Sequence, residues 1–151
     1  MKYLAFMTIT FLYYPTMQAQ KFNNPDSLFD PRPYGFSHVA TVLANKKLVF
    51  VAGQGGEENK DGKLSTDFRA QVRQSLQNIR IALQSQGVGM NAVVKVTTLV
   101  VDHNQQKLQV IIEEFEKVWS DKRFPVNTLI PVPKLALDNM QVEIDAMAIA
   151  N

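Results

Sequence analysis

The stretch from 93 to 101 constrains the fold of this chain more than any other. It reads Val-Val-Lys-Val-Thr-Thr-Leu-Val-Val, so apolar residues occupy both its odd and its even positions. β-Branched residues favour strands, and successive side chains of a strand point to opposite faces of the sheet. Both faces of this strand must therefore be buried.

The remaining patterns predict an α+β fold in the order β-β-α-β-α-β-β. We expect strands at 36–43, 47–52, 93–101, 126–132 and 141–149, and amphipathic helices at 68–83 and 108–119. The first two strands form a hairpin around the turn 44–46. Thr66 and Asp67 mark the start of the first helix, and Gly87 stands where its C-cap belongs.

Two helices can cover only one face of such a sheet. The second apolar face would then leave a patch larger than a monomer normally exposes. We therefore expect a homo-oligomer that packs sheet against sheet.

The composition indicates one globular domain with an N-terminal export signal. Residues 3–14 are almost wholly apolar, follow Lys2 and precede Ala19, which is typical of a secretory signal peptide over 1–19. Asparagines and prolines predict an extended leader over 20–35, before the domain at 36–151. The protein is thus expected to be secreted or periplasmic, with no membrane contact after signal cleavage; the alternative is an uncleaved segment that stays embedded in the lipid.

Several chemistries are disfavoured. The 151 residues include no cysteine, which excludes disulfides, thiolate catalysis and cysteine-ligated metals. A net charge of +2 gives no focused basic field for nucleic acid. His38 and His103 match no common metal spacing, and the Gly-Gln-Gly-Gly run at 53–56 lies too far from the next helix to cradle a phosphate. We expect neither metal nor cofactor.

Two carboxylates interrupt the last apolar strand. Glu143 and Asp145 are two residues apart, so they project from the same face. A carboxylate at a subunit boundary could orient water as a general base. The alternative is a solvated or ion-paired couple, with Lys95 on a neighbouring strand as the partner.

A set of short motifs resembles the RidA (YjgF) family. The motifs are Phe-Ser-His at 36–38, Leu-Val-Phe-Val-Ala-Gly-Gln at 48–54, Gln-Val-Arg-Gln-Ser-Leu-Gln-Asn-Ile at 71–79, Val-Val-Lys-Val-Thr at 93–97, Phe-Pro at 124–125 and Val-Glu-Ile-Asp-Ala at 142–146. They follow the family's order and span about 36 to 150. The resemblance implies a chorismate-mutase-like subunit in a homotrimer, with small-molecule clefts between neighbouring subunits.

The resemblance also implies roles for individual residues. Members of the active branch hydrolyse reactive enamines and imines to 2-oxo acids and ammonia: an arginine binds the substrate carboxylate, a glutamate positions water and a tyrosine lines the pocket. The catalytic glutamate corresponds to Glu143 and the glycine that ends the second strand to Gly53. The tyrosine corresponds to Phe36, and Asn127 stands at the arginine position, followed by Thr128 and Leu129.

Asn127 separates two functional hypotheses. A neutral amide cannot replace the bidentate contact between arginine and a carboxylate. The first hypothesis is a divergent member whose cleft binds a small neutral or amide-like ligand through Phe36, Gly53, Asn127, Thr128, Leu129 and Glu143. The second is an enamine/imine deaminase in which Glu143 orients water and Arg32, Arg123 or Lys134 holds the anion. Ribonuclease activity, also linked to the family, ranks third because the chain has no paired catalytic histidines and no basic stripe.

Overall fold

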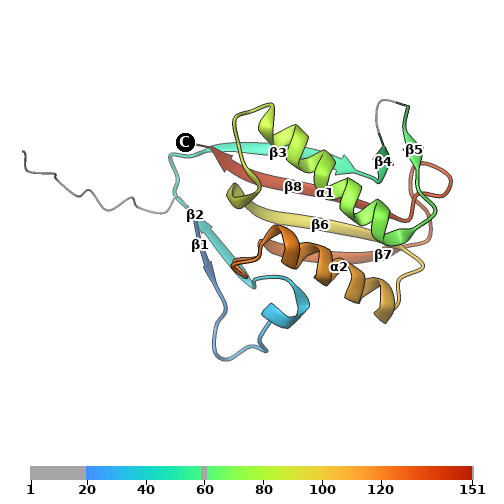
Figure 1. Ribbon diagram of the computed structural model, residues 1–151. Coiled ribbons are helices and arrows are strands. Elements are labelled where there is room, and N and C mark those ends of the chain that lie inside the picture. Colours follow the sequence, from blue (N-terminus) through green and yellow to red (C-terminus); the bar gives the residue numbers. More distant parts are fainter. Residues whose placement is uncertain (1–19, 59–60, 151) are drawn as a thin grey trace, which may run out of the picture.

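A four-stranded mixed sheet forms the centre of the computed structural model, which describes residues 20–58 and 61–150 (Figure 1). Its strand order is β3-β8-β6-β7, with bounds β3 (Lys47–Gln54), β8 (Val142–Ala150), β6 (Val93–Val101) and β7 (Val126–Val132). Strand β8 pairs antiparallel with β3 and with β6, whereas β6 and β7 run parallel. The predicted α+β class is confirmed, and β6 and β7 begin and end where the sequence predicted.

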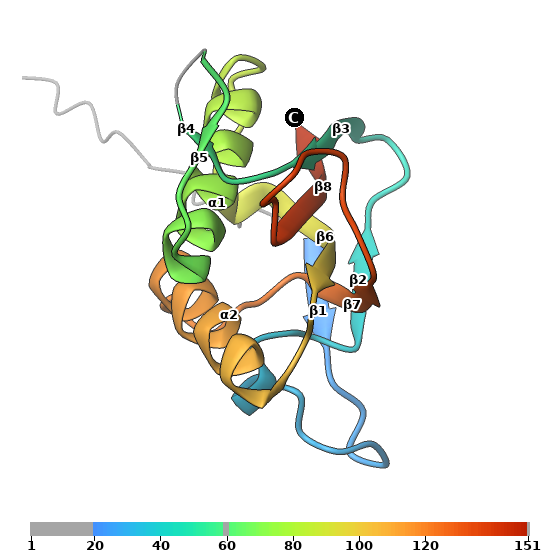
Figure 2. The same ribbon diagram turned by 90° about the vertical axis from the view of Figure 1, so that its right-hand side faces the viewer.

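Two helices cover one face of this sheet, as expected. Helices α1 (Phe68–Gln84) and α2 (Gln105–Val118) lie side by side in one layer, which Figure 2 shows edge-on beside the strands. Val72, Ile79 and Phe115 on the helices and Val96 and Val100 on β6 are at most 1% exposed. The apolar face of each helix and the alternate residues of each strand thus build one core.

Helix α1 begins and ends at the predicted signals. The Asp67 side chain accepts a hydrogen bond of 2.7 Å from the Ala70 N–H, as an N-cap does. After the helix, Gly87 has φ +69° and donates its N–H to Gln84 O, while the Val88 N–H reaches Leu83 O. This pattern is a Schellman C-cap, in which glycine takes the left-handed position at little cost.

The predicted hairpin between 36–43 and 47–52 is wrong. Strand β2 (Val39–Val42) pairs antiparallel with β1 (Gln20–Asn23), not with β3, and the two form a separate ribbon. Regular structure therefore begins within the predicted leader, which also contains a 3₁₀ helix (Arg32–Tyr34). Alternation of apolar residues identifies a strand but not its partner. The predicted signal peptide at 1–19 lies outside the described residues.

Three small elements complete the fold. Strands β4 (Glu57–Glu58) and β5 (Lys63–Leu64) form a short antiparallel ribbon before α1, and a 3₁₀ helix (Met90–Ala92) leads into β6.

The sheet face opposite the helices is incompletely buried. On this face Phe50 is 68% exposed and Leu48 is 46% exposed, whereas Val49 and Val51, which point toward the helices, are buried. Ile130 on β7 is also exposed. One chain thus leaves uncovered the second apolar face that the sequence indicated, and we refer to it as the open face.

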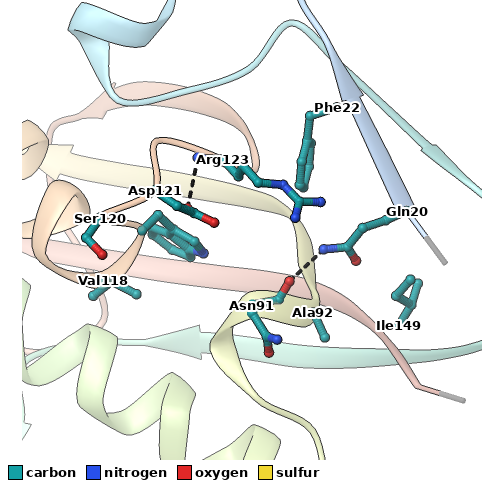
Figure 3. A pocket seen from close by; sticks show the side chains of 10 residues that line it. Gln20, Phe22, Asn91, Ala92, Val118, Ser120, Asp121, Arg123 and Ile149 are labelled. Carbon is teal, nitrogen blue, oxygen red and sulfur yellow. Dashed lines mark hydrogen bonds between the residues drawn. The ribbon is translucent and has the colours of Figure 1, made fainter. Parts of the chain in front are cut away.

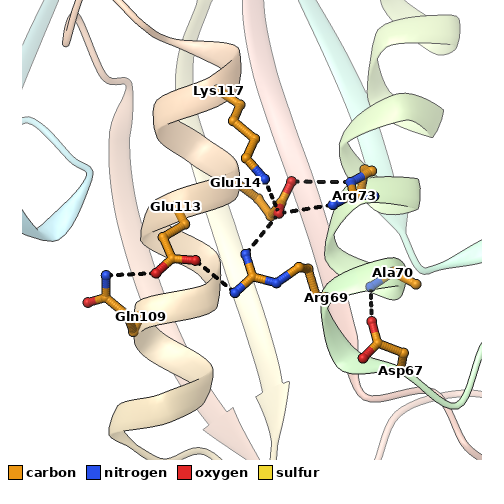
Figure 4. Close-up of polar contacts among 8 residues, drawn as sticks. All are labelled: Asp67, Arg69, Ala70, Arg73, Gln109, Glu113, Glu114 and Lys117. Carbon is orange, nitrogen blue, oxygen red and sulfur yellow. Dashed lines mark hydrogen bonds and ion pairs between the residues drawn. The ribbon is translucent and has the colours of Figure 1, made fainter.

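A cluster of charges joins the two helices on the outside of the helical layer (Figure 4). Glu114 of α2 is 3% exposed and pairs with Lys117 at 2.6 Å, Arg69 at 3.0 Å and Arg73 at 3.3 Å. Burial alone would raise the pKa of Glu114, but hydrogen bonds from Lys117, Arg73 and Arg69 outweigh it and lower the pKa to about 2. The buried carboxylate is therefore charged and compensated at neutral pH.

Candidate functional site

Four of the predicted ligand-binding residues line one cavity. It has a volume of about 580 Å³ and lies between α2, the start of β7 and the segment that connects β1 to β2. Its lining consists of Phe29, Tyr34, Phe36, Leu108, Ile111, Asn127, Thr128 and Leu129. None of these side chains carries a charge at neutral pH.

The position of Phe36 beside Asn127 follows from backbone contacts of its neighbour Ser37. The Ser37 N–H donates to Pro125 O at 3.1 Å, its hydroxyl donates to Phe124 O at 2.7 Å, and Ser37 bridges to Val126. Ser37 is 2% exposed. These contacts fix the chain around Phe36 against the start of β7, where Asn127 follows.

One wall of the cavity is aromatic, and we call Phe29, Tyr34 and Phe36 the aromatic wall. The Phe29 ring meets Tyr34 at 5.7 Å and Phe36 at 6.0 Å between centroids, edge to face in both cases. His38 extends the cluster, and its Nε2 lies 2.9 Å from Phe29 O. Sequence reasoning missed Phe29, Tyr34, Leu108 and Ile111, although the density of aromatic residues at 29–38 was a signal for this wall.

Asn127 reaches the cavity with its amide oriented by a buried neighbour. Its Oδ1 accepts a hydrogen bond of 3.1 Å from the hydroxyl of Thr98, which is 0% exposed. The Nδ2 group makes no hydrogen bond with any residue in the described ranges 20–58 and 61–150. It therefore presents two N–H donors to a ligand.

The other two predicted site residues, Gly53 and Glu143, meet at a separate place. Gly53 lies at an irregularity of β3, where the register with β8 shifts between Val51 and Gln54. A Cβ at position 53 would lie 2.6 Å from Cδ of Glu143 and 2.8 Å from its Cγ. A side chain at position 53 would therefore require the Glu143 side chain to move from this position.

Glu143 and Asn127 lie on opposite faces of the sheet. In β8 the neighbours of Glu143, Val142 and Ile144, are fully buried toward the helices, so Glu143 points to the open face. Asn127 shares its cavity with Leu108 and Ile111 and bonds to Thr98, on the helical side. Within one chain the predicted site thus forms two groups, the Asn127 cavity and the Gly53–Glu143 corner.

The second carboxylate of β8 has a structural contact. Asp145 accepts a hydrogen bond of 3.0 Å from the Thr97 N–H, and Lys95 Nζ donates to the Thr97 hydroxyl at 3.0 Å. Among the ion pairs of residues 20–58 and 61–150, none joins Lys95 to Glu143 or Asp145. The proposed ion-paired couple is therefore not formed within this chain, while Glu143 and Asp145 do share a face.

None of the three alternative cations lines the Asn127 cavity. Arg32 forms an exposed ion pair with Asp30 at 2.9 Å, and Lys134 lies 3.7 Å from Asp138. Arg123 belongs to another cavity, of about 470 Å³, whose lining includes Gln20, Phe22 and Trp119 (Figure 3). There Gln20 of β1 donates to Asn91 O at 2.6 Å. Among the residues that the structure describes, the cavity around Asn127 thus has no cation that could substitute for the arginine.

Neither a metal-binding cluster nor a membrane-spanning helix occurs in the part of the chain that the structure describes. Across 20–58 and 61–150, no three histidine or acidic side chains are grouped so that they could hold a metal ion. Neither α1 nor α2, the α-helices of the described residues, has the length and apolarity to span a membrane.

Comparison with known sequences identifies relatives in one family. The family model described as endoribonuclease L-PSP matches residues 32–150. A 2-iminobutanoate/2-iminopropanoate deaminase of Salmonella typhimurium is 29% identical over 104 residues, which are 68% of this chain and 79% of that protein. A RutC family protein of Pyrococcus horikoshii is 31% identical over 120 residues, or 78% of this chain and 90% of the relative.

Solved structures show the same fold. The Rid family protein YyfB from Yersinia pestis superimposes with a TM-score of 0.82 and 30% identity, over 88% of this chain and all of that one. The YjgF gene product of Escherichia coli gives a TM-score of 0.63 at 23% identity, over 72% of this chain and 85% of that one. By motifs, family match and fold, this chain belongs to the RidA (YjgF) family, whose family model is described as endoribonuclease L-PSP.

Proposed function

We propose that this protein forms homotrimers whose clefts between subunits bind a small neutral ligand, and that it is a divergent family member without 2-imino acid deaminase activity. Each cleft combines the Asn127 cavity of one subunit with the Gly53–Glu143 corner of its neighbour. The two groups are separate within one chain, and the exposed Phe50 and Leu48 mark the open face as the surface that association would bury.

One observation carries the choice of ligand. No charged side chain from residues 20–58 and 61–150 lines the Asn127 cavity, and Asn127 stands where the active branch is expected to hold the substrate carboxylate with an arginine. Burying a carboxylate there without a cationic partner would cost several kcal/mol, on the order of the penalty for an uncompensated charge. A neutral amide or carbonyl compound fits the Asn127 donors without this penalty.

Glu143 supports a second candidate function. Gly53 leaves room for its side chain, and the glutamate is retained at the position where the family resemblance implies water activation. Relatives of this chain include proteins named 2-iminobutanoate/2-iminopropanoate deaminase. In this alternative the protein hydrolyses imines, with Glu143 orienting the water that attacks the C=N carbon.

The deciding experiment is an assay of imine hydrolysis with amino-acid-derived imines generated in situ. We expect the unmodified protein to leave the background rate unchanged and Asn127→Arg to accelerate hydrolysis, because the new guanidinium restores the carboxylate contact. Asn127→Gln is the matched control, since it enlarges the side chain without adding charge, and it should remain inactive.

Imine hydrolysis by the unmodified protein would instead support the second candidate function. If the unmodified protein hydrolyses these imines and Glu143→Gln abolishes that activity, the protein is a deaminase and the neutral-ligand proposal fails.

A further inference from the structure

The aromatic wall offers a surface suited to a flat apolar ring. Phe29 and Tyr34 are 60% and 50% exposed, although large aromatic side chains are stabilised by burial. They are held edge to face rather than packed into the core. Leu108, Ile111 and Leu129 complete the apolar lining of the cavity. Its volume of about 580 Å³ lies within the usual range for small-molecule sites.

The polar end of the cavity specifies a hydrogen-bond acceptor. Because the Thr98 hydroxyl occupies Oδ1 of Asn127, the group that Asn127 offers is the Nδ2 donor. Thr128 borders the same cavity, but its side chain points to the open face, because Thr128 pairs with Thr97 whereas Asn127 pairs with Val96. A carbonyl oxygen of the ligand satisfies the Nδ2 donors of Asn127, whereas a free carboxylate would find no opposite charge.

Part of this arrangement lies outside the family match. The family model begins at residue 32, so Phe29 comes from a segment that the model does not include. Its ring nevertheless contacts both Tyr34 and Phe36. Phe29 thus adds to the aromatic wall a ring from outside the residues that the family model matches.

From these observations we infer that the ligand is a compound with a flat apolar ring and a neutral carbonyl acceptor, such as an aromatic amide. The ring lies against the aromatic wall, and the carbonyl oxygen accepts from Nδ2 of Asn127. This inference rests on the proposed function, because it specifies the neutral ligand of the same cleft.

Isothermal titration calorimetry of the full assembly with three probes tests it. Phenylacetamide has both features, acetamide lacks the ring, and phenylacetate replaces the amide with a carboxylate. We expect phenylacetamide to bind at least about tenfold more tightly than acetamide, because the ring buries apolar surface. Phenylacetate should bind at least about tenfold more weakly than phenylacetamide, because its charge is uncompensated.

A pair of matched variants locates the ring. Phe29→Leu should weaken phenylacetamide binding about two- to tenfold, the usual value of an aromatic contact, and leave acetamide binding unchanged. Phe22→Leu makes the same substitution in the same N-terminal region, but Phe22 lines the Arg123 cavity and should have no effect. Phe29 is largely exposed, so its replacement should not impair folding.

Failure of this inference differs from failure of the proposed function. Four results would overturn the inference that the ligand carries a ring. These are equal affinities for phenylacetamide and acetamide, tighter binding of phenylacetate than of phenylacetamide, equal effects of Phe29→Leu and Phe22→Leu, and no binding of any probe. The proposed function is tested separately, by the imine assay. It fails only if the unmodified protein hydrolyses the imines, whatever the binding results are.

Discussion

The two faces of the central sheet differ in how completely one chain buries them. On the helical face, Val96 and Val100 are at most 1% exposed beneath α1 and α2. On the open face, Phe50 is 68% exposed and shares its surface with the half-buried carboxylate Glu143. The helical face is therefore complete within the subunit, whereas the open face combines apolar surface with a candidate catalytic group.

We expect the two faces to have different roles, one in the stability of the chain and the other in association and ligand binding. Residues of the helical face should determine whether the subunit folds. Residues of the open face should determine whether subunits associate and whether Glu143 meets a ligand held by a neighbour. Substitutions on the two faces can therefore be compared by measuring unfolding and assembly in parallel.

The largest effect, a loss of free energy of unfolding, is expected from a cavity in the core beneath the helices. Phe115→Ala removes a ring that is 1% exposed and packs on Trp119 at 5.2 Å. The cavity left behind should lower the free energy of unfolding by about 3–5 kcal/mol, measured by urea denaturation. Leu137→Ala, at a position 46% exposed, is the control and should change it by less than about 0.5 kcal/mol. Equal losses in the two variants would show that the helical face is not the main source of stability.

A smaller effect is expected from a charge on the open face. Phe50→Lys should weaken subunit association by about 2–4 kcal/mol, the range of a central interface residue, and convert a trimer into monomers. Light scattering measures the mass directly. Gln77→Lys adds the same charge on an exposed position of α1 and should leave the trimer intact. A monomeric unmodified protein, or a Phe50→Lys trimer, would contradict the assignment of the open face to assembly.

The smallest effect is expected at the charge cluster outside the helical face. Glu114→Gln removes the carboxylate that pairs with Lys117, Arg69 and Arg73, and should lower the free energy of unfolding by about 2 kcal/mol at pH 7. The pKa of Glu114 is lowered from 4.5 to about 2 in the folded chain. Its stabilisation is therefore full above pH 4.5 and is lost as the pH falls toward 2.

Chemical denaturation at several pH values tests whether the stabilisation by Glu114 is lost on acidification. The difference between the unmodified protein and Glu114→Gln should shrink between pH 4.5 and 2. Glu116→Gln, which removes an exposed pair with Lys122, is the control and should cost less than about 1 kcal/mol. A difference that grows on acidification would contradict the charged state of Glu114.

Local patterns predicted the helices and most strands because their signals are contained in short segments. The nine residues of β6 carry their own β-branched pattern, and Asp67 and Gly87 cap α1 through contacts a few residues away. The partner of β2 could not be predicted in this way. Its pairing with Gln20–Asn23 depends on a contact between segments about 20 residues apart, and the same alternation fits β3 equally well.

The candidate site was predictable only in part for the same reason. The motifs indicated Phe36, Asn127, Thr128 and Leu129, which one cavity brings together. They did not show that Asn127 and Glu143 lie on opposite faces, because the pairing register sets that relation: Asn127 pairs with Val96 and Glu143 with Leu99. Phe29 and Tyr34 carried no motif, and their role follows from the path of the chain between β1 and β2.

That path has an evolutionary consequence. The segment between β1 and β2 supplies the aromatic wall but no strand of the central sheet (Figure 1). If the aromatic wall binds the ligand as proposed, mutations at Phe29 or Tyr34 alter which molecules are recognised while the folding core keeps its packing. Selection could diversify ligand preference among descendants of this chain by changing a surface loop, with little risk to the fold that carries it.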